Sequence, residues 1–285
     1  MDAGPAGIAQ ELRDWILDQA RSGRAPDEVL SALRARGWEE QAAIDAVEAA
    51  MRTHLEQHAR EHGLPPPVRV PAPIDANGPS LLRAGDREVR VLAALLHPRI
   101  VVFGGLLSDG ECEAMIALAR ERLARSTTTN LDTGADEPHA ARTSEGMFFA
   151  RGENTLCARI EARIAALLDW PLENGEGLQV LRYGPGAEYR PHYDYFDPAR
   201  PGTAGILARG GQRVASLVVY LNTPARGGAT TFPDAGMEVA AVRGNAVFFS
   251  YDRPHPMTRS LHGGAPVLEG EKWVATKWLR ERRYD

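Results

Sequence analysis

The chain has 285 residues, of which 44% are hydrophobic and 25% are charged, with 33 basic and 38 acidic side chains and a net charge of −5. This composition excludes a disordered chain, and two cysteines are too few for a fold held together by disulfides. All of the acidic excess lies in residues 1–63, and the neutral remainder argues against a protein that tracks the phosphates of nucleic acid.

The expected location is the cytoplasm. No apolar run reaches the length needed to cross a membrane, and the first residues do not follow the pattern of a signal peptide. Only Cys112 and Cys157 could form a disulfide, and we expect both to be reduced thiols in a reducing compartment. Neither a membrane nor a nucleic acid is predicted as a partner.

Residues 8–62 carry apolar side chains at helical spacing, which predicts three short amphipathic helices. We assign residues 1–63 to a small all-α bundle, a candidate interaction module for a protein partner or for pairing two copies of the chain. His54, His58 and His62 share one helix face. We interpret them as part of a solvated face rather than a metal site, because no further ligand accompanies them.

A domain boundary is expected in residues 64–80, where six prolines predict a semi-extended linker. From there the pattern becomes mixed α and β, which predicts a second domain over residues 81–285. A β-branched run at 99–103 predicts a strand. A capping box opens a predicted helix at 108–123, and apolar spacing predicts another at 154–168.

Beyond Pro171 the sequence predicts short strands that are separated by glycine and proline rather than by helices. The predicted strands are 178–183, 188–194, 214–221, 229–232, 238–242, 246–250 and 273–279. Such a series is typical of an antiparallel sandwich or barrel. Two long polar loops, 126–147 and 197–211, are candidate lids or binding loops.

A metal site is indicated by His192 and Asp194, which are two residues apart in a predicted strand and therefore expected on one face. His262 is the favoured third ligand. His255 is the alternative, but it lies between two prolines and is expected in a turn. Two histidines and one carboxylate on one side of a metal leave three open positions, the arrangement of non-haem Fe(II) oxygenases.

Lys272 adds a second element to this pattern. It is one of only two lysines in the chain and follows His262 by ten residues, at the start of the last predicted strand. A cation beside an Fe(II) site is suited to the distal carboxylate of 2-oxoglutarate, whose other end chelates iron. The alternative is a surface lysine that extends from an exposed strand.

Five segments in this order resemble the prolyl 4-hydroxylase group of 2-oxoglutarate/Fe(II) dioxygenases. The segments are 178–183 (LQVLRY), 191–196 (PHYDYF), 227–233 (GGATTFP), 261–267 (LHGGAPV) and 270–278 (GEKWVATKW). The similarity covers about residues 97–283, and residues 1–80 lie outside it. The resemblance implies an α+β fold: a double-stranded β-helix (jelly roll) with flanking helices, preceded here by the helical bundle.

The resemblance also implies roles for individual residues. Fe(II) would be held by His192, Asp194 and His262, and 2-oxoglutarate by Lys272, Tyr183, Thr230 and Trp278. Arg142, Ser144, Glu176 and Arg213 match positions that hold or orient a substrate peptide, and Arg213 and Asp194 are the candidates for a catalytic role. For Arg142, Glu176 and Arg213 the alternative is ordinary ion pairing at the rim of a cleft. Glu145 departs from the family pattern, in which a small residue often follows the serine.

The expected activity is hydroxylation of peptidyl proline, with O2 consumed and 2-oxoglutarate decarboxylated to succinate and CO2. Ascorbate is the expected reductant. Asp194 favours hydroxylation, because halogenating relatives lack this carboxylate. Two alternatives remain open: the same chemistry on a free amino acid or small metabolite, and a metal-binding jelly roll without catalysis.

Overall fold

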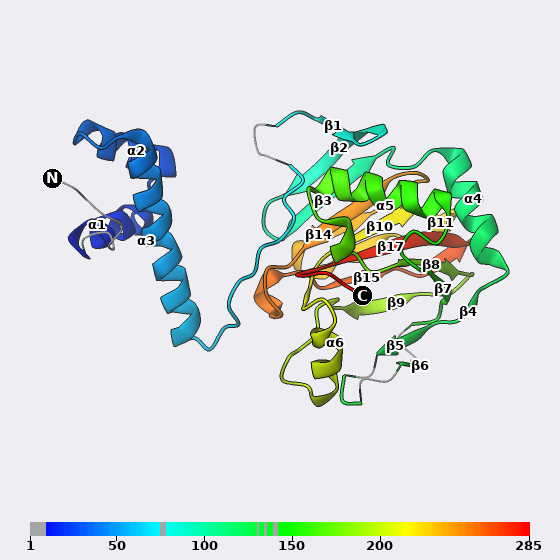
Figure 1. Ribbon diagram of the computed structural model, residues 1–285. Coiled ribbons are helices and arrows are strands. Elements are labelled where there is room, and N and C mark those ends of the chain that lie inside the picture. Colours follow the sequence, from blue (N-terminus) through cyan, green and yellow to red (C-terminus); the bar gives the residue numbers. More distant parts are fainter. Residues whose placement is uncertain (1–9, 75–77, 130, 134–135, 139–141) are drawn as a thin grey trace. The chain divides into compact units, whose positions relative to one another are not determined.

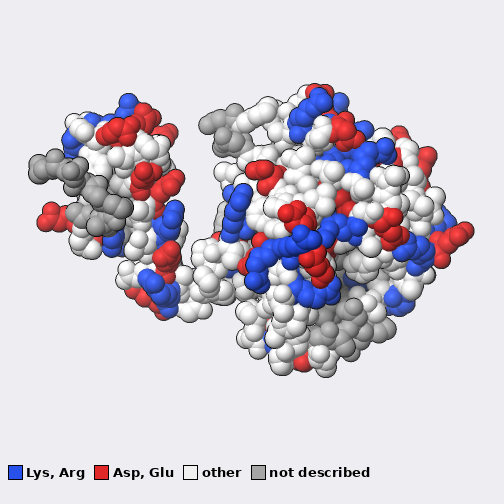
Figure 2. Space-filling view, in the orientation of Figure 1, with Lys and Arg blue, Asp and Glu red and all other residues white. Residues whose placement is uncertain are grey.

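The computed structural model describes residues 10–74, 78–129, 131–133, 136–138 and 142–285. The chain divides into two compact units, Met1–Pro66 and Pro67–Asp285. Within the described residues, none of the helices combines the length and the apolar character needed to cross a membrane. On the visible face of both units, acidic and basic side chains are interspersed (Figure 2).

The first unit consists of α1 (Gln10–Arg21), α2 (Pro26–Ala35) and α3 (Glu40–Glu61) (Figure 1). Pro26 occupies the first turn of α2, where its missing N–H costs nothing. Ile16 of α1 packs with Ala46 and Ala50 of α3 in a small apolar cluster. The three helices expected from the apolar spacing are therefore present.

His54 and His58 of α3 and the C-cap residue His62 follow one another along the helix without forming a ligand cluster. The ring centroids of His54 and His58 are 6.5 Å apart, and those of His58 and His62 are 4.0 Å apart. Among the described residues, the one group of metal-ligating side chains with converging atoms lies in the second unit.

The second unit is built on a nine-stranded antiparallel sheet of order β1-β2-β3-β14-β10-β17-β8-β7-β4. Its strands are β1 (Leu81–Ala84), β2 (Arg87–Leu95), β3 (Arg99–Gly104), β14 (Ala246–Ser250), β10 (Arg213–Tyr220), β17 (Lys272–Arg280), β8 (Leu178–Tyr183), β7 (Glu145–Phe149) and β4 (Ala124–Arg125). A four-stranded sheet contains β13 (Met237–Val239), β12 (Thr230–Phe232), β15 (His262–Gly264) and β9 (Tyr189–His192). Two further pairs are β11 (Arg226–Gly227) with β16 (Val267–Glu269), and β5 (Thr127–Thr129) with β6 (Asp136–Pro138).

Helices cover one face of the large sheet. They are α4 (Asp109–Arg120) and α5 (Thr155–Leu168). Their N-cap residues are Ser108 and Asn154, whose side-chain oxygens accept hydrogen bonds from the backbone N–H groups of Glu111 and Cys157. The apolar residues of both helices pack against the sheet in one continuous core. The remaining helix is the short α6 (Ala204–Ala208), and single 3-10 turns occupy Leu172–Asn174, Pro201–Thr203, Pro233–Ala235 and Pro256–Thr258.

Strand alternation separates two interiors. Along β10, Ala215, Leu217 and Val219 face the core under the helices, while Tyr220 belongs to a second core between the two sheets. Every residue of β17 is buried, because that strand lies between β10 and β8 with both of its faces covered. The expectation of mixed helix and sheet is confirmed.

Some elements differ from the sequence prediction. Strands β8 and β14 have the predicted bounds, whereas β1 and β2 were not predicted and the loop 126–147 contains β5, β6 and the start of β7. The first strands escape pattern recognition because β2 alternates poorly, leaving Leu92 exposed beside Val91, which is half-buried. Register shifts in the pairing of β2 with β3 disturb its period further.

Cys112 and Cys157 are both buried and free, each on a helix under the sheet. Burial raises the pKa of each thiol to about 11, so both remain protonated near neutral pH. They pack as small apolar side chains in the helix-covered core.

A buried ion pair joins α5 to β17. Lys277 Nζ lies 2.5 Å from Glu161 Oε1, and their side chains are 3% and 1% exposed. The other oxygen of Glu161 accepts the N–H of Gly152 at 2.7 Å. The pair thereby holds the helix layer in register with the central strand.

Replacing Glu161 by Gln should destabilise the second unit by about 3–5 kcal/mol, because the ammonium of Lys277 is then buried without a counter-charge. Urea unfolding followed by tryptophan fluorescence measures the loss. The double variant Glu161→Leu/Lys277→Met should recover most of it. As a control, Glu145→Gln removes an exposed pair with Arg182 and should cost about 0–1 kcal/mol. Equal losses in the two single variants would contradict the assignment.

Candidate metal centre

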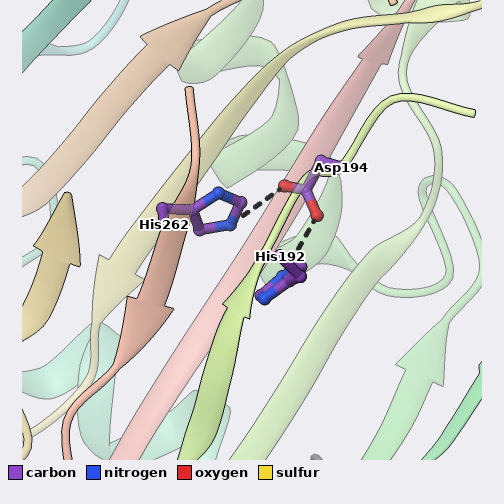
Figure 3. Close-up of side chains that lie close together, drawn as sticks. All are labelled: His192, Asp194 and His262. Carbon is purple, nitrogen blue, oxygen red and sulfur yellow. Dashed lines mark ion pairs between the residues drawn. The ribbon is translucent and has the colours of Figure 1, made fainter. Parts of the chain in front are cut away.

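His192, Asp194 and His262 converge at one point in the second unit (Figure 3). Strand β9 ends at His192 and pairs with β15, in which His262 lies directly opposite His192. Asp194 follows in a bend and is 8% exposed. One ligand atom from each residue lies within 4.8 Å of the others.

Asp194 reaches this point by a different route from the one expected. The predicted strand 188–194 is shorter in the structure, so strand alternation does not place Asp194 beside His192. The backbone leaves the sheet after His192 and turns the carboxylate back toward it. The two side chains therefore share one site although they do not share one strand.

Hydrogen bonds define which nitrogen each histidine offers. Nδ1 of His192 lies 2.9 Å from the carbonyl oxygen of Arg190, and Nδ1 of His262 lies 3.0 Å from that of Ser260. Because a carbonyl only accepts, Nδ1 carries the proton in each neutral ring and Nε2 keeps its lone pair. Backbone contacts of this kind orient metal-ligating imidazoles.

The lone pairs face the carboxylate with no proton between them. Nε2 of His192 is 3.5 Å from Asp194 Oδ1, and Nε2 of His262 is 3.4 Å from Oδ2 (Figure 3). Burial lowers the pKa of His262 to about 4, which keeps this ring neutral at neutral pH. Burial opposes ionisation of the Asp194 carboxylate, and the lone pairs of the two rings supply no positive charge to compensate it. Three electron-pair donors that cannot satisfy one another favour a bound cation.

His255, the alternative third ligand, lies outside this cluster. It caps the turn Pro256–Thr258, and its Nδ1 accepts the backbone N–H of Met257 at 3.1 Å. Of the two histidines considered, the structure therefore brings His262 to His192 and Asp194.

An inner cavity extends from the three ligands to Lys272 and is also lined by Tyr183, Thr230 and Trp278. Lys272 lies opposite Tyr183 in the pairing of β17 with β8 and is 4% exposed. Its Nζ lies 5.7 Å from the ring centroids of Tyr183 and Tyr220, and no described carboxylate pairs with it. Burial lowers its pKa to about 8. A buried, unpaired cation of this kind is an anchor for an anionic group.

Thr230 contributes a free hydroxyl proton to the inner cavity. The phenol of Tyr220 donates a hydrogen bond to Thr230 Oγ1 at 2.8 Å. Because the threonine hydroxyl is the acceptor in this contact, its own proton remains available to another group. The structure thus brings Lys272, Tyr183, Thr230 and Trp278 together around one cavity.

A larger cavity of about 900 Å³ opens beside the ligands. Its wall includes Glu176, whose carboxylate accepts two hydrogen bonds from Arg213, at 2.7 and 2.9 Å, and one from Arg280 at 2.7 Å. Burial raises the pKa of Glu176, but the two guanidinium groups outweigh it and the net shift is downward. The guanidinium of Arg213 also lies 3.9 Å from the ring centroid of Trp278.

Arg142 lines both cavities and is 5% exposed. Its guanidinium donates to Gln179 Oε1 at 2.8 Å and lies 4.8 Å from the ring centroid of Tyr189. Its Nε is buried without a hydrogen-bond partner among the described residues. Its hydrogen bond to Gln179 thus holds a cation beside both cavities, where it suits an acceptor group of a bound molecule.

Ser144 and Glu145 lie away from these cavities. Ser144 is fully buried, and its hydroxyl donates to Ser126 at 2.9 Å. Glu145 pairs with Arg182, which also pairs with Glu271, so the departure from the family pattern at Glu145 leads to a chain of ion pairs. The structure therefore gives neither side chain a position on the cavity wall.

Sequence reasoning missed four residues of this region. They are Tyr189, whose ring stacks on His192 at 3.7 Å, Arg280 beside Glu176, Ser216, which donates to Asp194, and Tyr251, which contacts Ser216. Arg280 had a signal, because it follows Trp278 by two residues on the same strand and so shares its face. Ser216 had none, since one serine in an apolar strand has no pattern of its own.

Comparisons with known proteins agree with this geometry. Residues 178–280 match the family model of the 2OG-Fe(II) oxygenase superfamily. Prolyl 4-hydroxylase 1 of Arabidopsis thaliana is 41% identical over 220 residues, which are 71% of this chain and 75% of that protein. Prolyl 4-hydroxylase 2 of the same plant is 39% identical over 66% of this chain and 69% of that protein.

A solved structure is also similar. A viral collagen prolyl hydroxylase from Paramecium bursaria Chlorella virus 1, in complex with 2-oxoglutarate, aligns with a TM-score of 0.50 and 31% identity. The alignment covers 64% of this chain and 95% of that chain.

Asp194→Asn and His262→Ala should each weaken divalent metal binding by at least about 10–100-fold, the cost of losing an outer-shell partner. Asp194→Asn removes the negative charge of one ligand, and His262→Ala removes the ligand nitrogen of another. Anaerobic titration calorimetry with Fe(II) or Mn(II) measures the affinity. His255→Ala is the matched control and should bind like the unmodified protein. If Asp194→Asn bound the metal equally well, the site would lie elsewhere.

Proposed function

Because the chain belongs to the prolyl 4-hydroxylase family of 2-oxoglutarate- and Fe(II)-dependent oxygenases, we propose that it hydroxylates proline residues of a peptide or protein substrate. The observation that carries this proposal is the cluster of His192, Asp194 and His262, with Lys272, which no described carboxylate pairs with, across the inner cavity. The relatives are named as prolyl 4-hydroxylases, and the geometry of the site supports hydroxylation of proline by this chain as well.

The donor set fits Fe(II). Two neutral imidazoles and one carboxylate supply three ligands on one side, the arrangement of non-haem iron oxygenases. His192 and His262 would each bind through Nε2, since Nδ1 is held by a backbone carbonyl. When bound, Fe(II) and 2-oxoglutarate supply the oxidant: O2 is consumed, 2-oxoglutarate loses CO2 to give succinate, and one oxygen atom enters a C–H bond.

The inner cavity fits 2-oxoglutarate. Lys272 would hold the distal carboxylate through a charge-assisted contact in a site shielded from water. The hydroxyls of Tyr183 and Thr230 line the same cavity and would donate to the same anion. Trp278 closes the side toward the larger cavity, which it also lines.

The larger cavity suits a peptide. Glu176 holds Arg213 against Trp278, so a cation and an aromatic face are fixed at the wall near the metal ligands. Arg142 lies at the junction of the two cavities, and its guanidinium is held there by Gln179. We assign Arg213, Glu176 and Arg142 to orienting the substrate. Ser144 does not line either cavity and contacts Ser126 instead, so no contact with the substrate is assigned to it.

The two candidate lids meet beside this cavity. The N–H of Gly202 donates to the carbonyl oxygen of Leu131 at 2.9 Å, and Arg200 pairs with Asp132 at 2.6 Å. Gly202 and Leu131 both line the cavity. Two loops joined in this way can cover an extended chain, which supports a peptide over a small metabolite.

Finer features of the sequence prediction belong to the same proposal. The two antiparallel sheets are proposed to form a double-stranded β-helix, and α1–α3 a bundle that binds a protein partner or a second copy of the chain. Ascorbate is the proposed reductant. A cytoplasmic location is supported by the two free cysteines.

Proline-rich peptides should strongly stimulate succinate release from 2-oxoglutarate in the presence of Fe(II). Peptide-independent succinate would keep the oxygenase chemistry and move the search to another substrate. Asp194→Gly should abolish turnover in either case, because it removes a ligand. No succinate under any condition, from protein that binds iron, would support a non-catalytic metal site instead.

The affinity for 2-oxoglutarate should fall as pH rises through about 8, because burial holds the pKa of Lys272 near that value and the neutral amine cannot anchor a carboxylate. Above this point we expect up to about tenfold weaker binding per pH unit. Titrations with the Mn(II)-loaded protein between about pH 7 and pH 9.5 measure this. Lys272→Arg keeps its charge and should lose the dependence. Identical pH slopes in both proteins would contradict the role of Lys272.

A further inference from the structure

Asp194 Oδ2, the carboxylate oxygen that faces His262, also accepts a hydrogen bond from a buried pair of hydroxyl groups. The hydroxyl of Ser216 donates to Asp194 Oδ2 at 2.5 Å, and the same oxygen of Ser216 lies 2.9 Å from the phenol oxygen of Tyr251. Ser216 is fully buried, Tyr251 is 2% exposed and Asp194 is 8% exposed. Water therefore does not compete for these contacts.

The direction in which the hydroxyl protons of Ser216 and Tyr251 point follows from which groups can accept a hydrogen bond. An ionised carboxylate only accepts, so the single proton of the Ser216 hydroxyl points to Asp194. Ser216 then has only lone pairs left for Tyr251, whose phenol must donate. The chain runs one way, from Tyr251 through Ser216 to Asp194, and each donor strengthens the next.

The contact matters because the neighbours of Asp194 cannot replace it. Both histidines present lone pairs rather than N–H groups to the carboxylate. Among the described residues, Ser216 is the only hydrogen-bond donor that reaches an Asp194 oxygen. A buried carboxylate that accepts no hydrogen bond destabilises the folded protein, so the donor at Ser216 is important to Asp194.

The backbone of both supporting residues is hydrogen-bonded to strands of the large sheet. Ser216 is central in β10, with Phe249 of β14 on one side and Trp278 of β17 on the other. Tyr251 directly follows β14, and its backbone N–H donates to the carbonyl oxygen of Val214 at 3.0 Å. Asp194, in contrast, lies in a bend outside any strand.

We propose that Ser216 and Tyr251 are positioning residues that couple the Asp194 carboxylate to the large sheet and aim it at the metal. The inference rests on the proposed iron site. It explains how a ligand in a bend can be as well placed as two ligands held by paired strands. Without these hydrogen bonds, the Asp194 carboxylate keeps its charge but its orientation is no longer fixed.

Ser216→Ala should weaken Co(II) binding by about 10–100-fold, as loss of an outer-shell partner does, and should change the visible absorption of the bound Co(II). Tyr251→Phe keeps the serine donor and should give a smaller loss in the same direction. Ser250→Ala is the matched control, because it removes a buried serine hydroxyl from the neighbouring strand β14. It should leave affinity and spectrum unchanged.

Circular dichroism and the melting temperature of each metal-free variant separate binding from folding. Affinity and spectrum like the unmodified protein in folded Ser216→Ala would overturn the inference, as would an equal loss in Ser250→Ala. If Ser216→Ala does not fold, Tyr251→Phe decides, and unchanged affinity there overturns it. Failure of the unmodified protein to bind Co(II) would count against the proposed iron site instead.

Discussion

Three electron-pair donors, two of them buried, face one another in the second unit with no proton to share. Nδ1 of His192 and of His262 is committed to a backbone carbonyl, so each ring presents a lone pair to the Asp194 carboxylate. A bound cation removes this repulsion. Without a cation, keeping the three donors so close together away from water costs free energy. The pairing of β9 with β15 holds the two histidines in place, and the contact with Ser216 holds Asp194.

The two lysines of the chain show how one strand serves both stability and chemistry. Lys272 and Lys277 lie on opposite faces of β17, since they are an odd number of residues apart. Under the helices Lys277 pairs with Glu161, and in the inner cavity Lys272 has no described carboxylate partner. A buried cation with a partner stabilises the fold, and a buried cation without one is suited to a ligand that brings the negative charge.

The site was more predictable from sequence than the fold around it. His192, Asp194, His262 and Lys272 could be recognised because ligand chemistry restricts residue type and spacing. Their three-dimensional route could not: Asp194 reaches the histidines through a bend, and the strands β1 and β2 lack a clean period. The position of Ser144 behind the cavity wall, and the support from Ser216 and Tyr251, depend on long-range packing that no local pattern records.

The central claim is tested most directly by following the oxygen atoms. A proline-containing peptide is incubated with the Fe(II)-loaded protein, 2-oxoglutarate and heavy-isotope dioxygen, and the products are analysed by mass spectrometry. The account predicts one heavy oxygen atom on proline for each heavy oxygen atom in succinate. Label in succinate with unmodified proline, or label on another residue, would contradict it.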